Sequence, residues 1–285
     1  MYRKIRFLLI MSLLSVFAQA NAQFDDPKTI EVGPHVGMSY YMGDLNPMLP
    51  FAQAQLEYGG VIRYNFDSRW TFRFDYTHAT GIADDAVIRW RPERGLNFTT
   101  RINDFSLVAE FNFIEYYTGN PKRNVSFYIF GGISAFQYTP YAMVGDSLVN
   151  LRYENIENRA LRYTEPPLTD SSWFAQFAYK SNPLAISIPF GVGVKFALSR
   201  HMAATVEWRM QKTFTDYLDD VATVYPEQPA IVDQTTFDLS DPTGYFLAGQ
   251  QRGNSAFNDW FGMARVSLTW KFNLPDGRGC NLSKF

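Results

Sequence analysis

The sequence predicts an all-β protein, an eight-stranded antiparallel transmembrane β-barrel with long extracellular loops and short periplasmic turns. Three observations indicate this fold. Apolar and polar side chains alternate with a period of two in segments of roughly ten residues, as expected of strands that cross a membrane. The connections between these segments are alternately short and long, and the chain begins with an export-type segment.

The first 22 residues are expected to be a secretory signal peptide, cleaved after Ala22. Basic residues precede an apolar run over 7–18, and Ala20 and Ala22 occupy the two positions that signal peptidase reads. A transmembrane anchor is the alternative, but it needs about 20 apolar residues and this run is shorter. Residue 23, directly after the cleavage site, is Gln and not Cys, so a lipid anchor at the mature N-terminus is not expected.

The composition argues against nucleic acid as a partner. The chain has 26 Lys and Arg against 28 Asp and Glu, and cleavage after residue 22 removes basic residues but no acidic ones. Domains that bind nucleic acid are usually basic. Because no linker or low-complexity tract divides the remainder, we expect one barrel domain over 23–272 and a periplasmic tail over 273–285.

The expected strands follow one another along the chain. The first covers 30–43, and the second and third lie within 53–79, on either side of a turn at 67–69. Their apolar faces carry Ile30, Val32, Val36, Met38, Tyr40, Leu56, Tyr58, Ile62, Tyr64, Phe66, Trp70, Phe72, Phe74 and Tyr76.

The remaining strands repeat this pattern. Alternation recurs over 104–113, 184–196 and 202–211, and in a last strand that ends at Phe272. The fifth strand, 126–138, is apolar on both faces, so the pattern leaves its orientation open.

The polar faces of the strands indicate which side lies inside. They carry small residues and charges of both signs, whereas Lys and Glu would dominate an exposed surface. A soluble sandwich or lipocalin-like barrel would turn its apolar face inward. We therefore expect outer-membrane lipid on the apolar face and charged side chains filling a narrow lumen, structural in role, with a proton or ion pathway as the alternative. These charged residues are Glu57, Arg63, Arg73, Asp75, Glu110, Lys195, Glu207 and Arg209.

The connections predict the orientation. Those at 67–69 and 199–201 are short and the one at 114–124 is moderate, whereas the others are mostly long. Such barrels have short periplasmic turns and long extracellular loops, so both termini are expected in the periplasm. The connections near 140–183 and 216–256 reach roughly 40 residues, a length that usually indicates a functional or disordered loop.

The sequence lacks the marks of an enzyme. Its three histidines, His35, His78 and His201, are not expected to converge on a serine and an aspartate, and no Gly-x-Ser-x-Gly motif occurs. The acidic cluster around Asp219 lacks the spacing of a calcium loop, so we expect a solvated strand end there. We expect no catalytic residue, no cofactor and no metal ion.

Three motifs resemble the PorG family of eight-stranded outer-membrane proteins, components of the type IX secretion system in Bacteroidetes. They are YMGDLNP after the first strand, IPFGVGVKF in the sixth and KTFTDYLDDVATVY at the end of the seventh, and the resemblance spans essentially the whole mature chain. Their motif residues are Gly43, Asp44, Asn46, Pro189, Gly191, Gly193, Thr213, Asp216, Tyr217, Asp219 and Asp220.

This resemblance implies a non-enzymatic role in protein transport. The family is associated with a periplasmic secretion ring made of a lipoprotein and its partner subunit, which the barrel would anchor or organise at the outer membrane. The alternative is a stand-alone outer-membrane barrel that acts as a surface adhesion or binding protein through its long loops.

The only cysteine, Cys280, lies in the expected periplasmic tail. A single cysteine has no partner within the chain, and in an oxidising compartment an odd cysteine tends to pair between chains. A free thiol and a disulfide to another periplasmic subunit are therefore both open.

Overall fold

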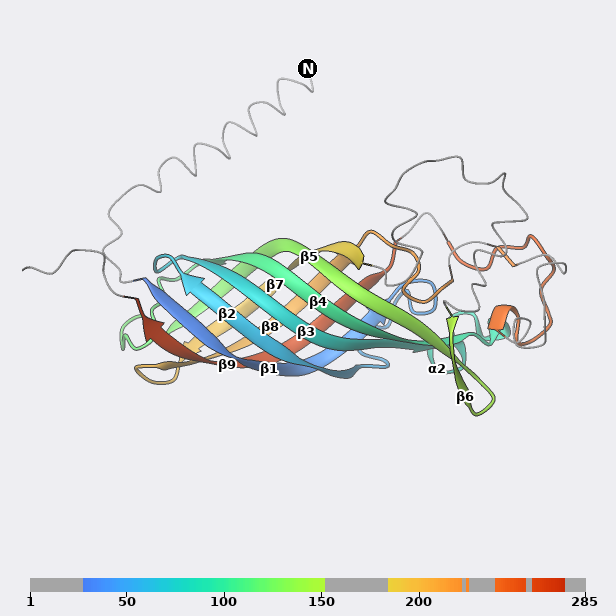
Figure 1. Ribbon diagram of the computed structural model, residues 1–285, viewed down its shortest axis with the longest axis horizontal. Coiled ribbons are helices and arrows are strands. Elements are labelled where there is room, and N and C mark those ends of the chain that lie inside the picture. Colours follow the sequence, from blue (N-terminus) through green and yellow to red (C-terminus); the bar gives the residue numbers. More distant parts are fainter. Residues whose placement is uncertain (1–27, 152–183, 222–223, 226–238, 255–257, 275–285) are drawn as a thin grey trace, which may run out of the picture.

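The protein forms a closed β-barrel (Figure 1). The computed structural model describes residues 28–151, 184–221, 224–225, 239–254 and 258–274. The signal peptide predicted at 1–22 and Cys280 lie outside these residues.

All eight predicted strands are present. They are β1 (Thr29–Met42), β2 (Gln55–Asn65), β3 (Trp70–Asp84), β4 (Asn97–Asn112), β5 (Val125–Val144), β7 (Leu184–Ala197), β8 (Met202–Thr213) and β9 (Trp260–Asn273). A ninth, short strand β6 (Ser147–Asn150) pairs only with β5, and the β3–β4 connection holds the short helices α2 (Asp85–Ile88) and η2 (Pro92–Arg94).

The eight long strands form one antiparallel ring. Neighbours in sequence pair with one another, β5 pairs with β7, and the ring closes where β1 pairs with β9, for example Val36 opposite Val266. A closed sheet has no unpaired edge, which is the arrangement that lets strands cross a membrane. The predicted closed, eight-stranded antiparallel barrel is thus confirmed.

The two faces of the barrel have opposite chemistry. On β3, Phe72 and Phe74 are 53% and 41% exposed, whereas Arg73 between them is 2% exposed. The same alternation runs round the barrel, and every charged side chain predicted to face the lumen is buried. The apolar face therefore points outward, as predicted.

The orientation of β5, which the sequence leaves open, is set by its neighbour β7. Phe127 and Ile129 are exposed, whereas Tyr128 is buried opposite Gly193. A side chain at residue 193 would overlap the Tyr128 ring, so this glycine of the IPFGVG motif makes room for an inward aromatic side chain.

Tyr40 departs from the predicted pattern. Its position in the alternation belongs to the outer face, but it is only 1% exposed. The Phe51 ring covers it at 4.3 Å between centroids, and the Trp208 indole N–H donates to its hydroxyl at 2.8 Å. The expectation that Tyr40 faces lipid is wrong, because the β1–β2 loop folds down over it.

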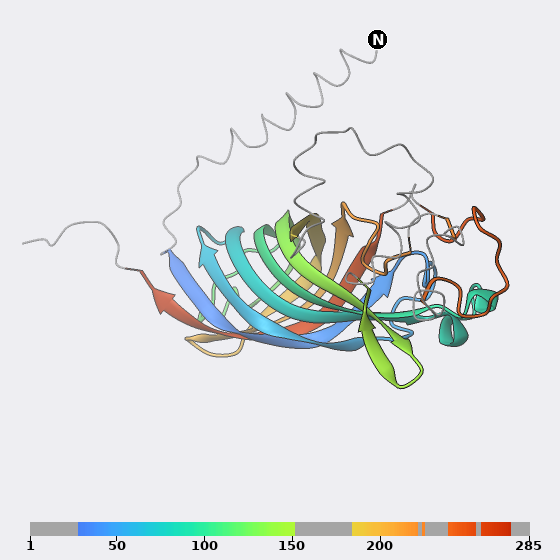
Figure 2. The ribbon, with the colours of Figure 1, turned by 45° about the vertical axis from the view of Figure 1, so that its right-hand side comes forward.

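The two ends of the barrel differ. Both described termini and the turns β2–β3, β4–β5 and β7–β8 lie at one end, the terminus end, while the long connections lie at the other, the loop end (Figure 1). The predicted loop near 140–183 begins later than expected, because β5 continues to Val144 and pairs with β6 in a hairpin that projects from the loop end (Figure 2). Among the described residues, no helix is both long and apolar enough to cross a membrane.

Candidate functional site

Arg73 is the centre of an ion-pair network that crosses the lumen. Its guanidinium lies 2.9 Å from Asp75, 2.6 Å from Glu110 on β4 and 2.5 Å from Glu207 on β8. Strands on opposite sides of the barrel are therefore joined through one buried cation.

Other cations extend the network along the lumen. Lys195 lies 2.6 Å from Glu110, and Arg265 lies 2.8 Å from Glu207. Arg209 pairs with Asp104 at 3.1 Å. Buried ions stabilise a fold only when they are paired and hydrogen-bonded, and here cations and carboxylates alternate through the barrel interior. The middle of the lumen is occupied by side chains.

The β4–β5 turn closes the terminus end of the lumen. Thr118 is buried and donates its hydroxyl to Glu31 at 2.5 Å, and the Lys271 ammonium donates to the Thr118 carbonyl. Glu31 and Lys271 are inward residues of the first and last strands, so this turn lies across the opening.

The segment 213–221, which we name the plug segment, closes the loop end. Its Leu218 is fully buried, and Thr100 of β4 donates its hydroxyl to the Leu218 carbonyl. Leu218 and Val221 belong to an apolar cluster at the mouth of the barrel. The other members are Tyr41, Leu45, Ala79, Ala83, Leu96, Phe98, Ile102, Phe136, Tyr138, Phe261 and Met263.

The expectation of a solvated acidic strand end is wrong. Asp219 is 1% exposed and Asp216 8%. The chain turns into the mouth after β8 instead of leaving it, because Leu218 and Val221 bury their apolar side chains there, and Asp219 is carried inside with them. Its Oδ1 accepts the N–H of Val221, which fixes the turn.

Two of the three sequence motifs meet at this plug. The Tyr41 hydroxyl lies 2.6 Å from Asp219 and 2.8 Å from Asp259. A side chain at Gly43 would overlap both the Tyr41 hydroxyl and the Asp259 carboxylate, and the Asn46 amide donates to the Tyr41 carbonyl at 3.1 Å. The GDLN residues therefore shape the place where the plug segment binds.

Burial and neighbouring acids favour the protonated form of the plug carboxyls. Burial, with the nearby Asp44 carboxylate, raises the pKa of Asp219 to about 7. Burial, with Asp219 and Asp216, raises the pKa of Asp259 well above its usual range. A tyrosine hydroxyl has one proton to donate, so a protonated carboxyl supplies the second hydrogen bond of this group.

The other motif residues have different positions. Thr213 ends β8 and donates its hydroxyl to the Asp259 carbonyl at 2.6 Å. Tyr217 packs against the apolar cluster, and Asp220 adopts φ 59° where the plug segment turns. Pro189 and Gly191 lie on β7, opposite Gln211 and Arg209 of β8.

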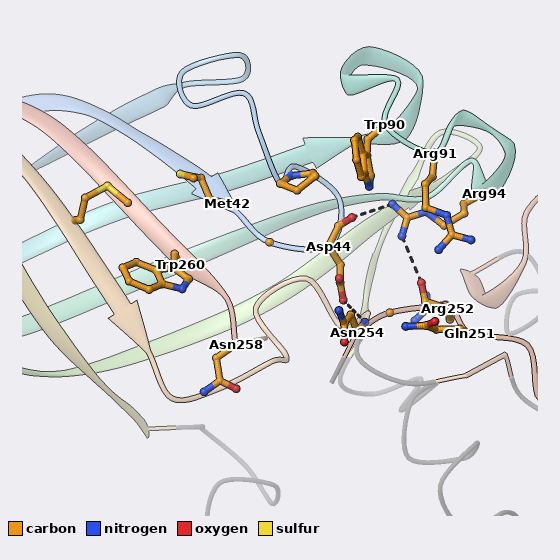
Figure 3. A pocket seen from close by; sticks show the side chains of 14 residues that line it. Met42, Asp44, Trp90, Arg91, Arg94, Gln251, Arg252, Asn254, Asn258 and Trp260 are labelled. Atoms are coloured by element: carbon orange, nitrogen blue, oxygen red, sulfur yellow. Dashed lines mark hydrogen bonds between the residues drawn. The ribbon is translucent and has the colours of Figure 1, made fainter. Parts of the chain in front are cut away.

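A pocket of about 640 Å³ lies beside the plug (Figure 3). Arg94 ties three loops together around it, donating to Asp85 at 2.7 Å, to the Asp44 carbonyl at 3.1 Å and to the Arg252 carbonyl at 3.3 Å. Asp44 in turn accepts the Asn254 N–H at 2.8 Å. The pocket wall is thus built from the β1–β2, β3–β4 and β8–β9 connections.

Sequence reasoning missed Tyr41, Asp259 and this pocket. Tyr41 stands directly before the GDLN motif at an inward position, which is a signal that the alternation contains. Nothing in the local sequence marks Asp259, because its partners come from β1 and from the plug segment. Within the described residues, no group of three or more His, Cys, Asp or Glu side chains is arranged to hold a metal ion.

Comparison with known proteins gives a family. Residues 4–158 match the family model described as a domain of unknown function, DUF6089. The chain belongs to this family. No curated protein matches this DUF6089 member.

Several solved barrels are similar to this DUF6089 chain at low identity. The N-terminal β-barrel domain of Pseudomonas aeruginosa OprF is 13% identical, with a TM-score of 0.37, over 86% of this chain and 97% of that one. Yersinia pestis Ail, solved with the heparin analogue sucrose octasulfate, is 8% identical (TM-score 0.39, 87% and 99% covered). Pseudomonas aeruginosa OprG is 9% identical (TM-score 0.39, 87% and 97% covered).

Proposed function

We propose that this protein is a non-enzymatic outer-membrane component of the type IX protein secretion machinery, which anchors or organises a periplasmic ring complex. The observation that carries the proposal is the filled lumen. A barrel crossed by the ion pairs of Arg73 and closed at both ends holds its place in a membrane but offers no route through itself. Such a barrel serves as an anchor better than as a channel.

The outer surface supports membrane insertion. Exposed apolar side chains occupy the outward positions of the long strands, for example Leu107 on β4 at 58% and Val206 on β8 at 50%. Water does not stabilise such a belt, but lipid does. We propose export by the signal peptide at 1–22, insertion into the outer membrane and a periplasmic terminus end.

The terminus end would face the ring subunits, a lipoprotein and its partner. The β4–β5 turn presents Phe113 and Ile114, which are 53% and 52% exposed, next to the ion pair of Arg123 and Glu115 at 3.1 Å. Exposed apolar residues edged by charge are typical of protein interfaces. The tail 273–285 would add a second contact.

A non-enzymatic role agrees with the positions of the histidines. His35 lies inside the barrel, 3.3 Å from Glu57. His78 on β3 hydrogen-bonds Asn103 on β4, and His201 stacks on Trp270 at the terminus end. Each has its own neighbours, and the three do not share a site.

Gene deletion with complementation tests the proposal. Loss of the protein is expected to leave type IX cargo in the periplasm, and crosslinking followed by affinity purification is expected to recover the ring subunits. A variant with Phe113→Ser and Ile114→Ser should insert normally but lose the subunits, whereas Val87→Ser at the loop end should keep them. Normal cargo export in the deletion strain would refute the secretion role.

A stand-alone surface binding protein is the second candidate. It is favoured by exposed apolar residues on the loops, since Tyr245 is 76%, Leu247 71% and Trp90 53% exposed. Under this alternative, the deletion strain would export cargo normally but lose adhesion to its surface ligand.

A further inference from the structure

The pocket at the loop end stands at the edge of the apolar belt. Met42 on β1 pairs with Trp260 on β9, and Met210 on the adjacent strand β8 also lines the pocket, so three neighbouring strands form its floor. These residues occupy the outward positions of their strands, in line with Met38 and Trp208, which are 58% and 49% exposed. The floor is therefore continuous with the surface that would face lipid.

The upper wall of the pocket is polar and positively charged. Its lining contains three arginines and one acidic residue; the arginines are Arg91, Arg94 and Arg252, and the acid is Asp44. Asp85 balances Arg94 in a bidentate pair, whereas the one ion-pair partner of Arg91 among the described residues is the exposed Glu93 at 3.3 Å. Exposed ion pairs contribute little to the stability of a fold, so Arg91 can give up its contact with Glu93 and bind a ligand anion instead.

Aromatic and amide side chains complete the pocket. Trp260 lies at the strand end of the pocket near Met42, and Trp90 lies beside Arg91 at the loops; the Lys212 ammonium lies 5.7 Å from the centre of the Trp260 ring. Gln251, Asn254 and Asn258 supply amide groups (Figure 3). Tryptophan is typical of the membrane–water interface, and amides beside aromatic rings suit the hydroxyls and faces of a sugar.

We infer that this pocket binds an outer-leaflet lipid with a phosphorylated saccharide headgroup. The phosphate would lie against Arg91, which can bind it with two parallel hydrogen bonds, and the saccharide would lie between the tryptophans. The first acyl carbons would lie on Met42 and Met210, which continue the apolar belt. This inference rests on the proposed insertion in the outer membrane and goes beyond the proposed secretion role.

The site would also explain the construction of the loops. Arg94 holds the three pocket-forming connections together from within, so the pocket is preformed rather than assembled by the ligand. A bound lipid would add a contact between the loops and the membrane plane.

Binding by the full-length barrel in amine-oxide detergent micelles tests the inference. The probe is a bisphosphorylated glucosamine-disaccharide lipid. Its binding is measured by tryptophan fluorescence and by mass spectrometry of the intact complex. Arg91→Gln removes one charge-assisted hydrogen-bonding group, and Trp90→Ala removes one aromatic ring contact. Each substitution is expected to weaken lipid binding about tenfold. Arg123→Gln, an equal change at the terminus end, should bind like the wild type.

Two further probes separate the possible ligands. The dephosphorylated lipid should bind more weakly than the phosphorylated one, and inorganic phosphate should not compete at equal concentration. Equal binding by both pocket variants and the wild type, equal binding of the dephosphorylated lipid, or competition by inorganic phosphate would each overturn the inference. Heat-modifiable migration and cargo export are measured on the same variants and report separately on insertion and on the secretion role.

Discussion

The hydroxyl of Tyr41 donates to the carboxylate of Asp219 at 2.6 Å, although 178 positions separate the two residues in the chain. Tyr41 stands on the first strand of the barrel, and Asp219 on the plug segment that follows β8. The bond is buried, so it holds the plug in the mouth without competition from water.

Replacing Tyr41 tests this hold. In Tyr41→Phe the two carboxyls of Asp219 and Asp259 lose their shared hydrogen-bond partner, which should weaken the closed position of the plug by about 1–3 kcal/mol. Hydrogen exchange of the amides of 216–221 should become faster, while exchange in β3 stays unchanged. Tyr58→Phe removes an exposed hydroxyl from the outer face and should leave the plug protected. Equal protection in both variants would contradict the role of Tyr41.

The plug should loosen as the pH rises. Burial and Asp44 raise the pKa of Asp219 to about 7, above its value in an unfolded chain. The folded state therefore holds the proton more tightly, so this contribution to stability is complete below pH ~4 and is lost as the pH passes through ~7. Exchange of 216–221, corrected for its intrinsic pH dependence, should rise between pH 5.5 and 8.5. Asp219→Asn should flatten this profile, and a flat wild-type profile would contradict it.

Removing one lumen carboxylate should destabilise the barrel. In Glu110→Gln the buried cations Arg63, Arg73 and Lys195 lose a shared partner. Breaking a buried pair in this way costs about 3–5 kcal/mol. The temperature at which the folded band is lost in gel electrophoresis should fall clearly. Glu115→Gln removes an acid that is 44% exposed and should change stability by less than about 1 kcal/mol.

The filled lumen predicts an electrically silent barrel. Reconstituted into planar bilayers, the protein should show no steady single-channel current, because Arg73 and its partners cross the lumen and closed segments cover both ends. Large, steady currents would mean that the network opens in the membrane. The matched measurement on Glu110→Gln shows whether one lost ion pair is enough to admit ions.

Cys280 predicts a covalent contact in the envelope. If the tail forms a disulfide with another periplasmic subunit, non-reducing electrophoresis with thiols blocked before lysis should show a larger band that reductant converts to monomer. Cys280→Ser should lack this band. A wild-type protein that runs as a monomer without reductant would leave Cys280 a free thiol.

The barrel could be predicted from the sequence because its information is local. Phe72 and Arg73 take opposite faces by parity alone, and this rule holds for every lumen charge that the alternation identifies. It fails at two positions. The β1–β2 loop folds over Tyr40, and the plug segment carries Asp219 into the mouth of the barrel. Such positions depend on contacts between distant segments, which no period of two encodes.

The pairing of β1 with β9 has a consequence for how the chain reaches its final state. Val36 lies on the first strand and Val266 on the last, so the ring cannot close until all eight long strands are present together. Contacts between such distant residues form slowly. Until then Arg265 on the last strand is absent, and Glu207 and Asp75 lack one of their cations. Assembly of the barrel should therefore be all-or-none. The final strand both completes the ring of backbone hydrogen bonds and brings the cation that neutralises buried carboxylates in the lumen.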